Sequence, residues 1–383
     1  MSSTITLPQI CWTGGTVPNP AALPETAPAE LRGHRWAALD SPALARQGES
    51  HSRFLHVAEQ GAVLQRSGSR VLLTAKEKVL LEVPVIKLQG VLVYGSIQIS
   101  TQCLRLLLDE GVWLSFFTRH GTYKGRLQPP ADGGGKLRRL QWERSCDPQF
   151  CLNFGRGVVR GKILAARQVA AAYAKNYLAE TLGEGHRVLR ESLERLETVK
   201  DLDELRGVEG NAGRAYFDLF RRWNRSEFLF PGRVKRGAAD PINVLLNFGY
   251  TLLARELEGL LEAAGLDPAV GFYHLPDGDR PSLACDWVEE FRHAAVDRLV
   301  LKLINNGVMK PDDFEDRGEK GGLRLATEGL RKFLRAYEKT LLGSGEPEDY
   351  GAAPGFRGIF LEQLARLLDS LTGGTPYRTW LER

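Results

Sequence analysis

Cysteine is scarce in this 383-residue chain, and histidine and methionine are few as well. The five cysteines form no CxxC pair and are odd in number, which argues against a zinc site and against a disulfide framework. A reducing compartment fits this usage, so we expect a cytoplasmic protein. The sequence also lacks an apolar run of the roughly 18 residues that span a bilayer, and its first residues lack a signal-peptide pattern. We therefore expect no membrane association.

An excess of one charge is also missing. The chain has 51 Lys and Arg against 47 Asp and Glu, so the net charge of +4 does not by itself predict a nucleic-acid-binding protein. Hydrophobic residues make up 43% and charged residues 26%, which is typical of a soluble globular protein and excludes a disordered or fibrous one. The length suggests two domains.

The pattern of turn residues predicts an α+β protein, in which a small N-terminal β-rich domain precedes a larger all-α domain. Residues 1–50 are rich in Pro and Ala and read as a leader or linker, and residues 51–130 contain short β-rich runs. Residues 131–145 begin with a glycine run after Pro129 and Pro130 and read as an exposed linker. Helical periodicity dominates residues 146–383.

Capping signals place several helices. In the β-rich part, Ser100 can cap a helix that stops near Gly111, and a strand pair follows around residues 120–121. In the helical part, Asp240 followed by Pro241 predicts a helix start and Gly265 its end. We expect further helices from a Ser282 cap to Gly307, over residues 323–342 and over residues 360–371.

Glu209 lies in a segment with glycine at every third position, residues 207–213. Such spacing allows another backbone to approach closely, which would present the acid on a crowded surface. A glutamate in the first turn of a helix, stabilised by the helix dipole, is the simpler interpretation.

A histidine and an acidic cluster are the other candidate groups. His274 lies in a non-helical segment that continues as a turn through residues 277–279, where a histidine is most often an ordinary polar residue. Asp286, Glu289 and Glu290 would share one helix face, either in solvent or around a divalent cation such as Mg²⁺ or Mn²⁺.

Basic residues are crowded around and after Glu209, and aromatic residues alternate with them. Such a segment suits phosphodiester chemistry on a polyanion, although an amphipathic helix with core aromatics gives the same pattern. The basic residues are Arg206, Arg214, Arg221, Arg222, Arg225, Arg233, Lys235 and Arg236. A second basic run follows Lys136, at the domain junction.

Four segments in this order resemble the CRISPR-associated integrase family Cas1. They are the glycine-rich stretch around Glu209, residues 243–250, the residues before His274, and residues 286–292. Residues 90–95 and 111–127 are similar to the N-terminal β domain of that family, so the resemblance covers roughly residues 52–383. Any one motif is weak, but their order and intervals are specific. Trp287, Glu290 and His293 depart from the residues usual in the family.

The resemblance implies a metal-dependent DNA endonuclease and integrase, which inserts captured DNA fragments into a CRISPR array by 3′-hydroxyl transesterification in antiviral defence. Glu209, His274 and Asp286 would be the catalytic metal ligands for Mg²⁺ or Mn²⁺, and Glu289 a supporting acid. Supporting or DNA-contacting roles would fall to another set: Arg214, Tyr216, Arg222, Arg233, Lys235, Arg236, Asn243, Asn247 and Arg292.

The same resemblance implies partners. These are DNA (the captured fragment and the CRISPR repeat), a second copy joined through the β domains, and a small dimeric protein, Cas2. Some relatives carry an iron–sulfur nuclease, Cas4, upstream, which leaves Cas4 open as a fused or separate partner, although Cys11 alone cannot hold a cluster. Two alternatives remain: a non-catalytic DNA-binding scaffold, and a structure-selective repair nuclease with the same metal site.

Overall fold

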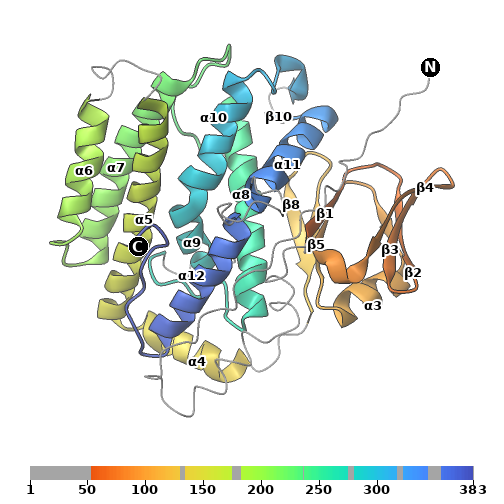
Figure 1. Ribbon diagram of the computed structural model, residues 1–383, viewed down its shortest axis with the longest axis horizontal. Coiled ribbons are helices and arrows are strands. Elements are labelled where there is room, and N and C mark those ends of the chain that lie inside the picture. The colour runs from red at the N-terminus through yellow and green to blue at the C-terminus, as the bar shows by residue number, and fades with distance from the viewer. Residues whose placement is uncertain are drawn as a thin grey trace, which may run out of the picture.

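The computed structural model describes residues 53–129, 134–174, 183–235, 237–274, 280–316, 322–343 and 355–382. A β-rich part occupies one end of the molecule and a larger helical part the other, with α8 and α11 facing the strands (Figure 1). The expected fold class is therefore confirmed. The predicted leader, residues 1–50, lies outside the described residues.

The β-rich part holds eight strands, one α-helix and a short 3₁₀ helix (Val85–Lys87) among its described residues. They are β1 (Arg53–Val57), β2 (Val63–Ser67), β3 (Arg70–Ala75), β4 (Lys78–Pro84), β5 (Leu88–Tyr94), β6 (Gln98–Ile99), α3 (Thr101–Asp109), β7 (Trp113–Phe117) and β8 (Tyr123–Leu127). One sheet has the order β1-β5-β7-β8 and is parallel except for the last pair. The other has the order β4-β3-β2-β6, with only β2 and β6 parallel.

Helices form most of the remaining chain. They are α4 (Gly134–Ser145), α5 (Pro148–Ala174), α6 (Gly183–Arg195), α7 (Leu202–Trp223), α8 (Pro241–Ala263), α9 (Ser282–Arg292), α10 (Arg298–Asn305), α11 (Thr327–Leu342) and α12 (Phe356–Leu371). A π-helical segment, His293–Asp297, joins α9 to α10, and the antiparallel pair β9 (Phe314–Asp316) and β10 (Leu323–Leu325) precedes α11. No described helix is long and apolar enough to cross a bilayer.

Strand β5 is buried along its whole length and belongs to two hydrophobic cores. Val91 and Val93 face the core inside the β-rich part, whereas Leu92 and Tyr94 join the core of the helical part. This alternation follows from the two-residue period of a strand. The two parts are therefore packed against each other through a shared sheet.

Most capping predictions are confirmed. The Ser100 hydroxyl accepts the backbone N–H of Cys103 at 3.2 Å, and Gly111 has a φ of 69° just after α3. Asp240 accepts the N–H of Asn243 at the start of α8, and Gly265 follows its end with a φ of 83°. These signals are local, which is why the sequence reveals them.

Four expectations were wrong in detail. Residues 134–145 form helix α4 rather than an exposed linker, because Leu, Arg, Gln and Glu after the glycines favour a helix. Ser282 is the first residue of α9 and Pro281 the residue before it, and the helix does not run unbroken to Gly307. Residues 323–325 pair with β9, so α11 starts only at Thr327. Helix α12 starts at Phe356, one turn before the expected start.

Candidate active site

Asp286 is the most enclosed of the predicted site residues. Its carboxylate, on α9, is fully buried and accepts four hydrogen bonds. The backbone N–H groups of Phe272 and Tyr273 donate to Oδ2 at 2.9 and 3.0 Å, and the N–H of His274 donates to Oδ1 at 2.7 Å. These bonds fix the non-helical segment before His274 against α9.

The His274 ring is oriented by the same carboxylate. Its Nδ1 lies 2.7 Å from Asp286 Oδ1, and a carboxylate only accepts, so Nδ1 carries the hydrogen and Nε2 is left free. This arrangement is typical of a metal-binding histidine, whose second nitrogen is held by a carboxylate. Gly271 permits the tight turn, because a Cβ there would lie 2.6 Å from the carbonyl oxygen of His274.

Glu209 and Glu289 meet at a lysine that the sequence analysis did not single out. Lys162 on α5 is buried, and its ammonium group bridges Glu209 of α7 and Glu289 of α9, the latter at 2.5 Å. The sequence signal that could have revealed Lys162 is its position on the apolar face of its helix. Residue 162 lies on the buried stripe of α5 with Val158, Val159 and Ile163, where an unpaired lysine would be costly.

Glu289 stays ionised although it is half-buried. Burial raises the pKa of its carboxyl, but the positive charges of Arg292 and Lys162 outweigh burial and hold the pKa well below its usual range. Arg292 Nη1 donates to both carboxylate oxygens of Glu289, at 2.9 and 3.0 Å. Burial raises the pKa of Tyr273, and the negative charges of Glu209 and Glu289 raise it further.

Glu290 does not share the site, in contrast to the expected common face of three acids. Its carboxylate is buried against the C-terminal segment, where it accepts the Tyr377 hydroxyl at 2.6 Å and the Gln363 amide at 3.0 Å. Burial, only partly offset by such bonds, raises the pKa of Glu290 to about 7. Each of the three acids of α9 therefore has a different partner set.

The donor groups are of the types that bind a hard divalent cation, but they are not arranged as a metal cage among the described residues. Glu209, Glu289 and the free Nε2 of His274 supply the carboxylate and imidazole groups that Mg²⁺ or Mn²⁺ accepts. Both acids already contact one cationic group, the ammonium group of Lys162. However, no group of three His, Cys, Asp or Glu side chains is arranged as a metal cage among the described residues. The ligand roles therefore stay predictions.

The glycines around Glu209 do not bring a second backbone close. A Cβ added to Gly207 or Gly210 would meet no atom within 4 Å, so these glycines face open space. The interpretation as a crowded surface was therefore wrong, and so was the simpler one of a first-turn glutamate, because α7 begins at Leu202 and Glu209 lies about two turns inside it. The acid is instead held by Lys162 of α5.

The predicted DNA-contacting residues divide into exposed and buried groups. Arg214, Arg222 and Lys235 are exposed, whereas Tyr216, Asn243 and Arg292 are buried and act as support. Arg233, half-buried, donates to the side-chain oxygens of Asn243 at 3.0 Å and Asn247 at 2.6 Å, so these three predicted contacts bind one another. Arg236 lies outside the described residues, as do residues 275–279.

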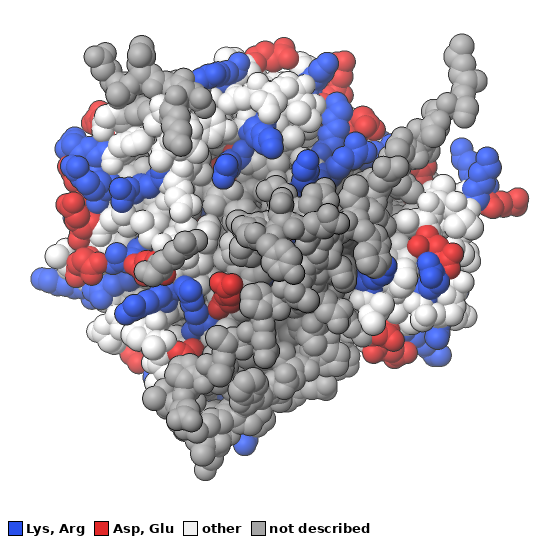
Figure 2. All heavy atoms as spheres, viewed as in Figure 1, with Lys and Arg blue, Asp and Glu red and all other residues white. Residues whose placement is uncertain are grey.

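The aromatic residues among these basic residues form core packing. Tyr216, Phe220 and Trp223 are fully buried, and Phe228 and Phe230 nearly so. Lys and Arg side chains, with Asp and Glu among them, lie on the surface over α5, α6 and α7 (Figures 1 and 2). The interpretation as core aromatics is confirmed.

The match to known proteins covers most of the chain. Residues 55–339 match the family model described as CRISPR associated protein Cas1. The chain belongs to this family. The CRISPR-associated endonuclease Cas1 1 of Chlorobaculum tepidum is 34% identical over 298 residues, which are 76% of this chain and 87% of that protein. Cas1 3 of Thermus thermophilus is 34% identical over 84% of this chain and 95% of its own length.

Solved structures show the same fold. A Cas1 protein from Thermotoga maritima superposes with a TM-score of 0.71 and 25% identity, over 85% of this chain and 99% of that one. A casposase bound to integration product has a TM-score of 0.73 and 24% identity, over 86% of this chain and 93% of that one. The Cas1 resemblance is confirmed, and an endonuclease or integrase acting in spacer integration for CRISPR adaptation is supported.

Proposed function

We propose that this Cas1-family chain is a divalent-metal-dependent integrase that joins the 3′-hydroxyl of a captured DNA fragment to a phosphodiester of a CRISPR repeat. The observation that carries the proposal is the convergence of Glu209 and Glu289 on one cationic group, beside a histidine whose ring is fixed by Asp286. Carboxylates and an oriented imidazole are what a phosphodiester-transfer site requires. The family matches support the same conclusion.

Glu209 and His274 would hold Mg²⁺ or Mn²⁺ as predicted, and Glu289, predicted as a supporting acid, would join them as a ligand. Asp286, predicted as a ligand, would instead orient His274, because its carboxylate already accepts four hydrogen bonds. The ion supplies positive charge for the scissile phosphate and for the attacking and leaving oxygens. Asp286 keeps His274 Nε2 directed away from its own carboxylate, and Arg292 keeps Glu289 ionised. None of these residues needs to form a covalent bond with DNA.

The proposed partners are DNA, a Cas2 dimer and a second copy of this chain, with Cas4 as a fused or separate nuclease. Support comes from structures of similar proteins, which include a Cas6-RT-Cas1–Cas2 complex and a TtCas1–DNA complex. The exposed Arg214, Arg222 and Lys235 can contact phosphates without reading bases, so we expect steep salt dependence and weak sequence preference.

A strand-transfer assay tests the proposal. Supercoiled plasmid with a repeat, short duplex DNA and Mn²⁺ or Mg²⁺ are combined with the full chain, with and without Cas2. Glu209→Gln and His274→Asn should lower the rate of joining at least a hundredfold, because each removes one charge or donor at the reacting centre. Asp218→Asn is the matched control, since Asp218 is an exposed acid of the same helix α7 and pairs with Arg221.

The wild-type products separate the alternatives. Joined product that disappears in both site variants but persists in the control supports the integrase. DNA binding without product, even with Cas2 present, favours the scaffold. Cutting without joining favours the repair nuclease.

A further inference from the structure

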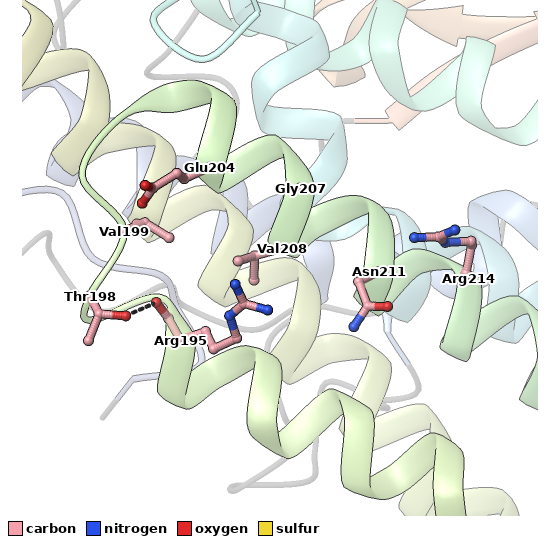
Figure 3. A pocket seen from close by; sticks show the side chains of 8 residues that line it. All are labelled: Arg195, Thr198, Val199, Glu204, Gly207, Val208, Asn211 and Arg214. Atoms are coloured by element: carbon pink, nitrogen blue, oxygen red, sulfur yellow. Dashed lines mark hydrogen bonds between the residues drawn. The ribbon is translucent and has the colours of Figure 1, made fainter.

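A cavity of about 480 Å³ lies between α6 and α7, away from the candidate active site. Its lining on α7 includes Glu204, Gly207, Asn211 and Arg214, which recur every three or four residues and so share one helix face. At 3.6 residues per turn, Asn211 and Glu209 point roughly 200° apart around α7. We call this cavity the α6–α7 groove; Figure 3 shows the Arg195 side chain extending into it from α6 toward Val208.

Two arginines of the groove have no counter-ion among the residues that the structure describes. Within the described part of the chain, the guanidinium groups of Arg195 and Arg214 have no ion pair or hydrogen bond, and both side chains are exposed. The side-chain amide of Asn211, between them along the groove, has no partner there either. Three donor side chains of one groove are therefore available to a ligand.

Four other arginines of the same helices are paired with acids. On α6, Arg187 lies 3.1 Å from Glu191 and Arg190 lies 4.0 Å from Glu194. On α7, Arg206 and Arg221 pair with the aspartates three residues before them, Asp203 and Asp218. Such i,i+3 and i,i+4 pairs are the common arrangement on a helix surface. The groove is thus a place where positive charge is left uncompensated.

The shape of the groove favours an extended ligand. From Glu204 to Arg214 it follows ten residues of α7, or about 15 Å at 1.5 Å per residue. A single phosphate would leave most of that length empty, and Gly207 keeps the floor open because no side chain rises from it. Guanidinium groups bind phosphate oxygens in a bidentate manner and read no bases.

The two ends of the groove differ in charge, because Glu204 lies at one of them. It is the acid among the lining residues, and its carboxylate accepts the backbone N–H of Lys200 at 2.9 Å. A phosphate beside Glu204 would be repelled, whereas one beside Asn211 or Arg214 would be attracted. The basic end of the groove is therefore the binding end.

We infer that the α6–α7 groove is a second DNA-binding site, which holds the sugar–phosphate backbone of one strand with Arg195, Asn211 and Arg214. The inference rests on the proposed function for its choice of DNA. It adds a site on the opposite face of α7 from Glu209, so that one helix contacts the reacting strand on one side and a second strand segment on the other.

Salt-dependent binding tests the inference. Fluorescence anisotropy of labelled single-stranded and duplex DNA is measured with the full chain in chelator, over a series of salt concentrations. Arg195→Ala combined with Arg214→Ala should make the slope of log K against log salt shallower by about 1.4 on single strands and about 1.8 on duplex. Arg187→Ala combined with Arg190→Ala makes the same charge change on α6 and should leave the slope unaltered.

Glu204→Gln provides a gain of binding that misfolding cannot produce. The glutamine amide oxygen can still accept the Lys200 N–H, while the repelling charge is gone, so DNA should bind severalfold more tightly. A change confined to single strands assigns the groove to an overhang, and a change on both DNAs assigns it to a duplex strand as well.

Equal slopes for the groove variant and wild type, or equal losses in the groove variant and the control, would overturn the inference. Wild-type chain that joins DNA normally in the strand-transfer assay would then leave the proposed function standing. Wild-type chain that binds no DNA in either form would overturn both.

Discussion

Lys162 is the residue whose role in the candidate site is clearest from the structure. It is buried in α5, yet it touches acids from two other helices. A buried ammonium group between two carboxylates keeps them together while no other cation is present, because each acid alone would pay a desolvation cost. The same position would be contested by a divalent ion.

Replacing Lys162 should therefore change stability and metal response in opposite directions. Lys162→Met should lower the free energy of unfolding by about 2 kcal/mol without metal, since it leaves the half-buried Glu209 without Lys162 and leaves Glu289 with Arg292 alone. Added Mn²⁺ should raise the melting temperature more in the variant than in wild type, because no ammonium group competes with it. Differential scanning fluorimetry with and without Mn²⁺ measures both effects.

The control for this experiment is Lys302→Met, the same substitution at an exposed lysine of α10. It should alter neither the melting temperature nor its response to Mn²⁺. If Lys162→Met and wild type gain equally from Mn²⁺, the ion does not bind where Lys162 sits.

At the scale of single residues, the sequence predicted some of the residues of the candidate site and missed others. Glu209, His274 and Asp286 were named through a family resemblance, and the structure places His274 directly on Asp286. Nothing in the local sequence says that Asp286 would accept three backbone N–H groups, or that Lys162 would reach Glu209 from 47 residues away. Those facts depend on how α5, α7 and α9 pack.

At the scale of elements, the junction between α9 and α10 could not be predicted from capping residues. The helix contains a π segment, His293–Asp297, in which His293 Nδ1 lies 2.6 Å from Asp297 Oδ2 and both residues are buried. Asp297 also accepts the Tyr250 hydroxyl from α8. A π segment widens the helix by one residue and is stabilised by such contacts rather than by capping residues. Helices α3 and α8 carry local caps, and their ends were predicted closely.

Strand β4 lies where its sheet can pair with a strand of another chain. It forms an edge of its sheet, and Val79 on the strand and Ile86 just after it are 61% and 57% exposed. Edge strands with apolar side chains favour pairing with another chain. This supports the proposal that two copies associate through their β-rich parts.

Charges on this edge should separate the two copies. Val79→Glu combined with Ile86→Glu should convert a dimer to a monomer in size-exclusion chromatography with light scattering, with little change in monomer stability because both side chains are already exposed. Val308→Glu places the same charge at an exposed apolar residue of the helical part and should leave the dimer intact. A dimer that survives the double substitution places the contact elsewhere.

At the scale of the whole molecule, an ion cluster joins the first described strand to the last helices. His56 of β1 lies 3.0 Å from the Tyr94 hydroxyl and 2.9 Å from Glu338 of α11. Arg357 of α12 donates to Glu338 at 2.8 Å and to Glu256 of α8 at 2.6 Å. Since 282 residues separate His56 from Glu338, no sequence pattern could indicate this contact.

This cluster makes stability fall in acid. Burial raises the pKa of Glu338, but Arg357 and His56 outweigh burial and lower it to about 2. A carboxyl whose pKa is lower in the folded state than its usual 4.5 stabilises the fold above pH 4.5, and this contribution is lost as the pH falls toward 2. At 1.36 kcal/mol per pKa unit, the loss is about 3 kcal/mol.

Urea unfolding at a series of pH values checks this prediction. Wild type should lose about 3 kcal/mol more than Glu338→Gln between pH 5 and pH 2, because the glutamine has no charge to titrate. At pH 7 the variant should be the less stable of the two. Parallel curves for the two proteins would show that Glu338 contributes no acid sensitivity.

The double burial of β5 also matters while the chain is being made. Strands β5 and β7 leave the ribosome before α8, with Leu92, Tyr94 and Trp113 directed toward a core that does not yet exist. Trp113 packs against Gly259 of α8, which is translated almost 150 residues later. At 5–20 residues per second, synthesis of the residues from Trp113 to Gly259 takes on the order of ten seconds, and the apolar face stays exposed for that time. A nascent chain stalled before α8 should therefore be a preferred client of chaperones that recognise exposed apolar strands.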